Sequence, residues 1–209
     1  MFFISDIHGE FKKLREWTKT MDYSLQLGDM GLGFPKNERD KYFVEDLNHK
    51  FLRGNHDDPA VCRMKPNYLG DYGFCEKQNI FYVSGGYSID QAYRIIGVSW
   101  WEDEELSYET GFKVIDLYQK TKPKIVATHE CPTIIKKYAL SNFMKNGITS
   151  RTEKLLQNLF EIHQPEYWIF GHHHKYIYQK IHNTQFVGLD EAVAGEKQNC
   201  IFEIKGIKW

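Results

Sequence analysis

Five short apolar runs in this chain each lead directly into polar residues of the kind that bind metal ions. Strands that end in such residues gather them along one edge of a sheet, and active sites in α/β folds lie beyond the carboxyl ends of the strands. The pattern therefore predicts one site built from both ends of the chain. The runs and their polar clusters are Phe2-Phe3-Ile4 before Asp6 and His8, Leu25-Gln26-Leu27 before Gly28-Asp29, Phe51-Leu52 before Gly54-Asn55-His56-Asp57, Ile125-Val126-Ala127 before His129, and Trp168-Ile169-Phe170 before Gly171-His172-His173-His174.

The composition indicates one globular domain over residues 1–209. Apolar residues make up 42% of the chain and charged residues 26%, which argues against disorder. The net charge of −1 gives no electrostatic basis for general nucleic-acid or membrane binding. We find neither a secretory signal pattern nor an apolar stretch of about 20 residues that would span a membrane. The cysteines are scattered without a C-x-x-C pair, so we expect reduced thiols in a cytoplasmic protein.

Helix and strand patterns alternate in the first and middle parts of the chain, and antiparallel-type strands fill the rest. Pro123 and Pro165 follow two of the predicted helices and prevent their continuation. We therefore predict an α/β fold with two mixed sheets and helices outside them, not a purely parallel sheet. The predicted strands are 2–5, 23–27, 50–53, 80–83, 94–99, 124–128, 166–170, 176–181, 184–187 and 201–204, and the predicted helices are 10–20, 38–47, 107–122 and 151–162.

The polar clusters combine imidazoles and carboxylates without a thiolate. Such ligands suit zinc, iron, manganese, cobalt or nickel and argue against a structural cysteine-type zinc site. Two such ions about 3.5–4 Å apart can share a carboxylate and clamp an in-line displacement at phosphorus. In that chemistry a bridging water loses a proton and becomes the nucleophile, and a protonated histidine can give a proton to the leaving oxygen.

The ordered clusters resemble the calcineurin-like metallophosphoesterase family, because all five blocks occur in the family's order between residues 6 and 174. The resemblance implies a four-layer α/β sandwich of two mixed β-sheets flanked by helices. It also implies that His56 lies over the leaving group as proton donor and phosphate contact. The implied metal ligands are Asp6, His8 and His174 for the first ion, Asn55, His129 and His172 for the second, and Asp29 between the two.

The second block departs from the branch that contains Ser/Thr protein phosphatases and diadenosine tetraphosphatases. That branch continues Gly-Asp with Asp-Arg-Gly, whereas this chain reads Met30-Gly31-Leu32-Gly33 after Asp29. The segment from residue 85 to 101 is similar instead to small phosphoesterases of bacteria and their phages. Arg94 in that segment is our candidate for the missing phosphate contact, because arginine binds phosphate bidentately. A strand arginine that faces solvent or forms an ion pair is the alternative.

His56 and Asp57 are the predicted catalytic residues, and Asn55, His56 and Arg94 the predicted substrate contacts. A carboxylate close to an imidazole favours its protonated form. We therefore expect Asp57 or Asp58 to keep His56 cationic near pH 7.

The leading functional hypothesis is a dinuclear metal-dependent phosphoesterase that hydrolyses a phosphomonoester or phosphodiester by attack of a metal-bridging hydroxide. We expect manganese in first place, with iron, zinc, nickel, cobalt or magnesium as alternatives. The substrate would be a phosphorylated small molecule or a nucleotide. The alternatives are a nucleotide-specific hydrolase for dinucleoside polyphosphates or cyclic nucleotides, a Ser/Thr protein phosphatase, and a metal-bound scaffold without catalysis.

Overall fold

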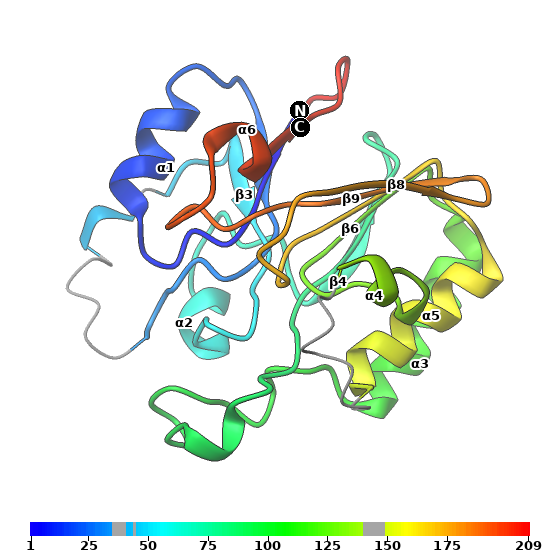
Figure 1. Cartoon of the computed structure of the whole chain (residues 1–209), viewed down its shortest axis with the longest axis horizontal. Helices are drawn as coiled ribbons and strands as arrows, with labels where there is room; N and C mark the ends of the chain where they lie inside the picture. Colours follow the sequence, from blue (N-terminus) through cyan, green and yellow to red (C-terminus); the bar gives the residue numbers. More distant parts are fainter. Residues whose placement is uncertain (35–40, 44, 140–148) are drawn as a thin grey trace.

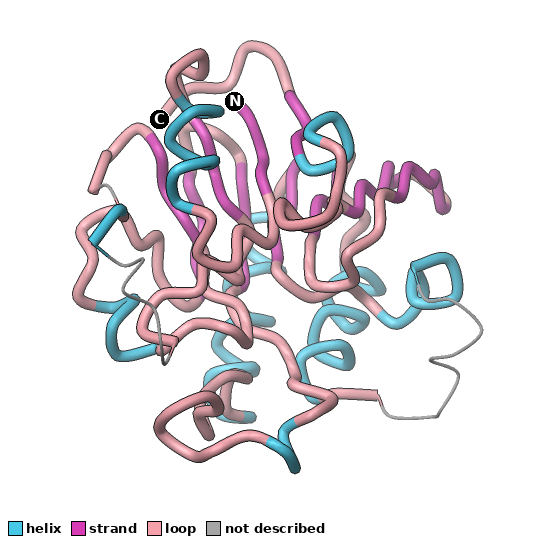
Figure 2. The backbone as a smooth tube through the Cα atoms, turned by 60° about the vertical axis from the view of Figure 1, so that its left-hand side comes forward, coloured by secondary structure: helices cyan, strands magenta, loops and turns pink. Residues whose placement is uncertain are grey.

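The computed structural model describes residues 1–34, 41–43, 45–139 and 149–209, which form two β-sheets (Figures 1 and 2). The four-stranded sheet has the order β10-β1-β2-β3 and comprises β1 (Phe2–Ile4), β2 (Ser24–Gln26), β3 (His49–Phe51) and β10 (Ile201–Glu203). The six-stranded sheet has the order β4-β5-β6-β7-β9-β8 and comprises β4 (Tyr72–Cys75), β5 (Ile80–Val83), β6 (Ile125–Thr128), β7 (Tyr167–Phe170), β8 (Ile177–Ile181) and β9 (Thr184–Gly188).

Both sheets are mixed. In the first, β1, β2 and β3 are parallel and β10 pairs antiparallel with β1. In the second, β5, β6, β7 and β9 are parallel, and β4 and β8 are antiparallel edge strands. The carboxyl ends of parallel strands lie at the same edge of a sheet, so the polar clusters after β1, β2 and β3 gather at one edge of the first sheet and those after β6 and β7 at one edge of the second.

The helices cover the outer faces of the sheets. Figure 1 shows α1 (Phe11–Thr18) beside the four-stranded sheet, and α3 (Tyr108–Thr121) and α5 (Arg151–Ile162) together at the opposite side of the molecule. The shorter helices are α2 (Pro59–Arg63), α4 (Thr133–Ala139) and α6 (Lys197–Cys200), and a 3-10 turn covers Gln91–Tyr93. Among the described residues, no helix is both long and apolar enough to cross a membrane.

Three apolar clusters separate four layers. One lies between the sheets and includes Phe3, Leu25 and Ile169. A second lies between the six-stranded sheet and the helices α3 and α5, and a third packs α1 against the four-stranded sheet. Both faces of the six-stranded sheet are apolar because both are covered. In strand β5, Ile80 and Tyr82 face the other sheet, while Phe81 and Val83 face the helices. The predicted sandwich of two mixed sheets with helices outside is confirmed.

The helix ends follow their sequence signals. Ser107 and Ser150 cap α3 and α5 by accepting a hydrogen bond from the backbone N–H three residues on. Helix α3 ends at Thr121, and the next residue, Lys122, adopts a left-handed conformation (φ 42°) directly before Pro123.

One predicted strand, 94–99, is wrong. Its backbone turns at Gly97 (φ 71°), and the only ladder contact of the segment is an isolated bridge between Ile96 and Trp100 within the described residues. Ile95 and Ile96 are 65% and 68% exposed, because the segment belongs to an excursion between β5 and α3 and does not enter the sheet. The helix predicted over 38–47 falls partly on residues outside the described part of the chain.

Candidate metal centre

The residues that follow the strands turn sharply. Five predicted ligands have a left-handed backbone, with φ 48° at Asp6, 47° at His8, 53° at Asp29, 67° at His172 and 46° at His174. Such a conformation costs a residue other than glycine about 1–3 kcal/mol, and it concentrates at functional sites where the surrounding structure enforces it. The shared turn is what directs these side chains from separate strands towards one point.

Two glycines allow the loops to approach closely. A Cβ atom at Gly54 would overlap the carboxylate of Asp29, and one at Gly171 would overlap the side chains of Ser5 and Asp6. Each glycine directly precedes a predicted ligand, Asn55 or His172. The Gly-Asn and Gly-His pairs of the sequence are therefore steric requirements of the site.

The first group of predicted ligands contains Asp6, His8, Asp29 and His174, whose ligand atoms lie within 4.8 Å of one another. The Nε2 atoms of His8 and His174 are 3.2 Å apart. Nε2 of His174 is 3.5 Å from Asp6 Oδ1, and Nε2 of His8 is 3.8 Å from Asp29 Oδ2. Both carboxylates are buried, whereas the His174 side chain is 39% exposed, so the group opens to solvent on the histidine side.

The second group contains Asp29, His129 and His172, again within 4.8 Å, and Asn55 adjoins it. Nε2 of His129 lies 3.3 Å from Asp29 Oδ1, 3.1 Å from Asn55 Oδ1 and 3.2 Å from His172 Nδ1. Asp29 belongs to both groups, with one oxygen toward each. The structure thus brings together every predicted ligand and sets Asp29 between the two groups.

The ring nitrogens of this centre test whether the residues fit a cation. Nδ1 of His129 is 3.0 Å from the carbonyl oxygen of Leu27. A carbonyl only accepts, so this nitrogen carries the proton and Nε2 presents a lone pair to the centre. Nε2 of His172 likewise faces Glu130 at 3.2 Å, which leaves its Nδ1 with a lone pair. Metal-binding histidines have this arrangement, in which the outer nitrogen donates to a carboxylate or carbonyl.

Two lone pairs that face each other at 3.2 Å need a proton or a cation between them. Burial disfavours the protonated imidazole, but the carboxylate of Glu130 raises the pKa of His172 to about 9. A metal ion displaces such a proton when it binds. The donors of this second group therefore fit a divalent cation.

The carboxylates of the centre are ionised. Burial favours the neutral acid at Asp29, but the imidazoles of His129, His56 and His8 hold its pKa well below the usual range. The pKa of Asp6 is also lowered, because His174 and His129 outweigh its burial. The metal-free centre is therefore already charged as ligands require.

Glu130 contacts the histidines of the site, although the sequence patterns did not single it out. It is buried and accepts hydrogen bonds from Nε2 of His173 at 2.7 Å and from the backbone N–H of Cys131 at 2.8 Å, in addition to its contact with His172. On the first group, Glu191 Oε2 lies 3.6 Å from His174 Nδ1 in a similar position. His173 points to Glu130 and Cys131, away from the two groups. The only sequence signal for Glu130 is its position directly after the predicted ligand His129.

The amide of Asn55 is also oriented by buried residues. Its Nδ2 donates to Ser88 Oγ at 3.2 Å, and the Ser88 hydroxyl donates to Glu104 Oε2 at 2.5 Å. Because the nitrogen is held this way, the amide oxygen faces His129. Glu104 lies in an acidic run of the sequence but is itself buried.

His56 lies at the open side of the centre. Its ring stacks on Phe34 at 5.2 Å and meets His8 edge-on at 5.0 Å between centroids. Arg94 donates to its Nε2 at 2.8 Å, to the carbonyl oxygen of Asn55 at 3.2 Å, and pairs with Asp90. Arg94 therefore both forms an ion pair and reaches the site. Burial lowers the pKa of His56 to about 4, although Asp29 acts against this.

The expected support of His56 by Asp57 needs correction. The buried carboxylate of Asp57 accepts hydrogen bonds from the backbone N–H groups of Gly31 at 2.7 Å, Leu32 at 3.1 Å and Gly54 at 2.8 Å. It ties together the loops that carry Asp29 and His56. Asp58 instead caps α2 by accepting from two N–H groups. Neither carboxylate is held by the imidazole of His56. The structure therefore does not support the expectation that Asp57 or Asp58 keeps His56 cationic near pH 7.

Comparisons with known proteins agree with this site. The family model of the calcineurin-like phosphoesterases matches residues 1–176, and the chain belongs to that family. It is a metal-dependent phosphoester hydrolase, as its family and site define. No curated protein matches the sequence.

Two solved structures share the fold at low identity, and a third matches with a lower TM-score. TT1561 of Thermus thermophilus is 12% identical with a TM-score of 0.53, and the match covers 91% of this chain and 89% of that one. The anchor of the inner membrane complex of Plasmodium is 11% identical with a TM-score of 0.50, covering 97% and 77%. A predicted phosphoesterase of Streptococcus pneumoniae is 12% identical with a TM-score of 0.43, covering 97% and 82%.

Proposed function

We propose that this chain hydrolyses a phosphomonoester or phosphodiester at a centre that holds two divalent cations. The observation that carries the proposal is the position of Asp29 between two groups of inward-facing ligand atoms. Asp6, His8 and His174 would hold one ion, and Asn55, His129 and His172 the other. Bound there, the ions would polarise the phosphoryl group and lower the pKa of a water molecule.

The chain's own residues would orient the substrate. Arg94 lies beside His56 at the open side, and the Arg94 side chain is only 8% exposed. A planar guanidinium with two donors matches two phosphoryl oxygens. Arg94 would thus fix the phosphoryl group against the centre, and the carbonyl of Asn55 would hold the guanidinium in place.

His56 would then supply a proton to the leaving oxygen. Before substrate binds, Nε2 of His56 accepts from Arg94, so the imidazole is neutral. A phosphoryl group that binds Arg94 releases Nε2 and adds negative charge beside it, which favours the protonated imidazole. The same position allows proton transfer to the leaving group. Substrate binding, and not Asp57, would set the charge of His56.

The proposal is tested by hydrolysis of p-nitrophenyl phosphate and bis-p-nitrophenyl phosphate with metal-stripped protein reloaded with manganese, iron, nickel, cobalt, zinc or magnesium. We expect turnover restored by metal and abolished by Asp29→Asn, with the exposed Asp116→Asn as matched control. The ratio of the two rates distinguishes a monoesterase from a diesterase. Absence of turnover with metal bound and with a broad panel of phosphoesters would contradict the proposal and favour a scaffold.

A nucleotide-specific hydrolase is the second candidate, because aromatic rings stand beside the leaving-group position. Phe34 stacks on His56, and Trp101 lies 5.9 Å from Phe34 between centroids. Stacking a base on such rings contributes about 1–3 kcal/mol. If this candidate holds, Trp101→Ala raises KM for nucleotides and leaves KM for a sugar phosphate unchanged. Equal changes for both substrates would argue against it.

A further inference from the structure

The segment that connects β5 to α3 packs against the second group of candidate ligands. A Cβ atom added at Gly86 would lie 3.0 Å from the ring of His129 and 3.6 Å from Asn55 Oδ1. Arg94 donates to the carbonyl oxygen of Asn55 at 3.2 Å, and Ser88 Oγ accepts from Nδ2 of Asn55 at 3.2 Å. This segment therefore holds both the backbone and the side chain of Asn55.

One buried carboxylate closes the segment at its base. Oε1 of Glu104 accepts the backbone N–H of Ser88 at 2.9 Å, and Oε2 accepts the Ser88 hydroxyl at 2.5 Å. The two residues are 16 positions apart in the chain and are 3% and 1% exposed. The carbonyl oxygen of Glu104 accepts from Nη1 of Arg53 at 2.9 Å, and Arg53 is itself buried. These bonds fix the positions of Ser88 and Glu104 beside the centre.

The carboxylate also sets the direction of the hydrogen bonds that reach Asn55. An ionised carboxylate only accepts, so the Ser88 hydroxyl directs its hydrogen to Glu104. The Ser88 oxygen then faces Asn55 with a lone pair and takes Nδ2 as its donor. The amide oxygen is left on the side of His129, with its Nε2 3.1 Å away. Burial raises the pKa of Glu104, but the bonds from Ser88 and the charge of Arg94 favour the ionised form.

We propose that Glu104 is a positioning residue that determines which atom of Asn55 meets a metal ion. The oxygen and the nitrogen of an amide are similar in size, but the oxygen has lone pairs for a cation and the NH2 group only donates. With Ser88 directed by Glu104, the oxygen is the atom presented to the centre. This inference rests on the proposed two-cation centre and goes beyond it, because a residue outside the ligand set controls the affinity for one ion.

Glu104→Gln tests the orienting effect with little change in shape. The one accepting oxygen of glutamine stays with the Ser88 N–H, so its NH2 group faces the Ser88 hydroxyl and donates to it. The hydroxyl hydrogen then turns to Asn55 and favours the inverted amide. Metal-stripped protein is titrated with manganese in competition with a chromophoric chelator, without substrate. We expect one ion to bind about tenfold more weakly and the other with unchanged affinity.

Ser88→Ala separates orientation from charge. Removal of a negative charge near a cation weakens its binding directly, whereas the orienting effect passes through the Ser88 hydroxyl. Ser88→Ala should therefore weaken the same ion by a similar factor, and Glu104→Gln should add nothing in the double variant. A full additional loss in the double variant would show that charge is the cause and would overturn the proposal. Unchanged affinity in Ser88→Ala would refute it even if Glu104→Gln does not fold.

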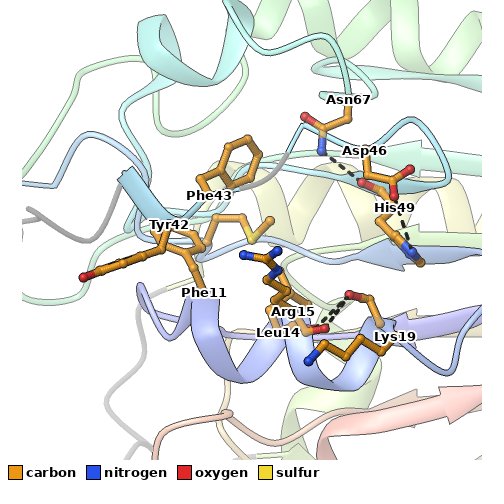
Figure 3. A pocket seen from close by; sticks show the side chains of 11 residues that line it. Phe11, Leu14, Arg15, Lys19, Tyr42, Phe43, Asp46, His49 and Asn67 are labelled. Carbon is orange, nitrogen blue, oxygen red and sulfur yellow. Dashed lines mark hydrogen bonds and ion pairs between the residues drawn. The ribbon is translucent and has the colours of Figure 1, made fainter.

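Asp46→Asn is the matched control for loss of a carboxylate that accepts a backbone hydrogen bond. Asp46 accepts from the N–H of Asn48 at 2.9 Å and faces His49 at 3.9 Å, beside the cavity that α1 lines (Figure 3). This variant should leave both affinities unchanged. Two ions with unchanged or equally weakened affinities in Glu104→Gln would overturn this inference alone. A wild-type protein that binds fewer than two ions would overturn the proposed function as well.

Discussion

Replacing Glu130 by glutamine tests how the centre controls its histidines. The carboxylate accepts from the imidazoles of His172 at 3.2 Å and His173 at 2.7 Å. Glutamine has nearly the same shape but only one accepting oxygen. One imidazole would therefore meet an amide NH2 group in place of an acceptor, and His172 would lose the partner that fixes its lone pair toward the metal position.

The magnitude follows from the geometry. Loss of a carboxylate that orients a metal-binding histidine weakens metal binding or activity about 10- to 100-fold, which corresponds to about 1.4–2.7 kcal/mol. Because Glu130 contacts only His172 among the candidate ligands, the loss should fall on one of the two ions. Glu191→Gln should affect the other ion less, since Glu191 is 24% exposed and its contact with His174 is 3.6 Å long.

The assay is a competition titration of metal-stripped protein with a chromophoric chelator, which resolves two affinities. Glu161→Gln, an exposed glutamate of α5, is the control for loss of a charge elsewhere. Equal weakening of both ions would show that the fold, and not one histidine, is disturbed. Unchanged affinity for both ions in Glu130→Gln would refute the reasoning.

Three further predictions concern catalysis and stability. His56→Ala should reduce turnover of an alkyl phosphate at least about 100-fold and that of p-nitrophenyl phosphate much less, because nitrophenolate leaves without a proton; equal losses would exclude the donor role. Asp71→Asn should lower the free energy of unfolding at pH 7 by about 3 kcal/mol, since Arg53 is buried and Asp71 lies 2.7 Å from its Nε. Burial disfavours the charged carboxylate, yet Arg53 holds the pKa of Asp71 below its usual value, so the stabilisation is present above about pH 4 and is lost as pH falls through the folded-state pKa. Urea unfolding of both proteins at pH 7 and pH 3 checks this, and a difference that does not shrink at pH 3 would contradict it. Gly171→Ala should abolish metal binding in equilibrium dialysis, because its Cβ would overlap Ser5; retained binding would contradict the steric argument.

The sequence was most informative where ligand-type residues come shortly after a strand. Asp6, Asp29 and His129 each come within three residues of the end of a strand. Parallel pairing places the loops of Asp6 and Asp29 side by side in one sheet, and those of His129 and His172 side by side in the other. The layers were also predictable, because the spacing of apolar residues differs between helices and strands. The prediction of a strand at 94–99 was wrong because apolar side chains indicate a strand even where, among the described residues, no neighbouring strand pairs with the segment.

Other features depend on contacts that one sequence does not reveal. Asp57 adjoins His56 along the chain, yet backbone N–H groups of a different loop determine where its carboxylate points. Glu130 could be recognised only when the ring nitrogens of His172 were placed.

The central claim is that this centre needs two cations bridged by Asp29. Its most direct test is the rate of p-nitrophenyl phosphate hydrolysis as metal is added to stripped protein in known equivalents. The protein concentration is kept high enough that metal binding is stoichiometric. The account predicts little activity at one equivalent and a plateau at two. A plateau at one equivalent, or full activity in Asp29→Asn, would contradict it.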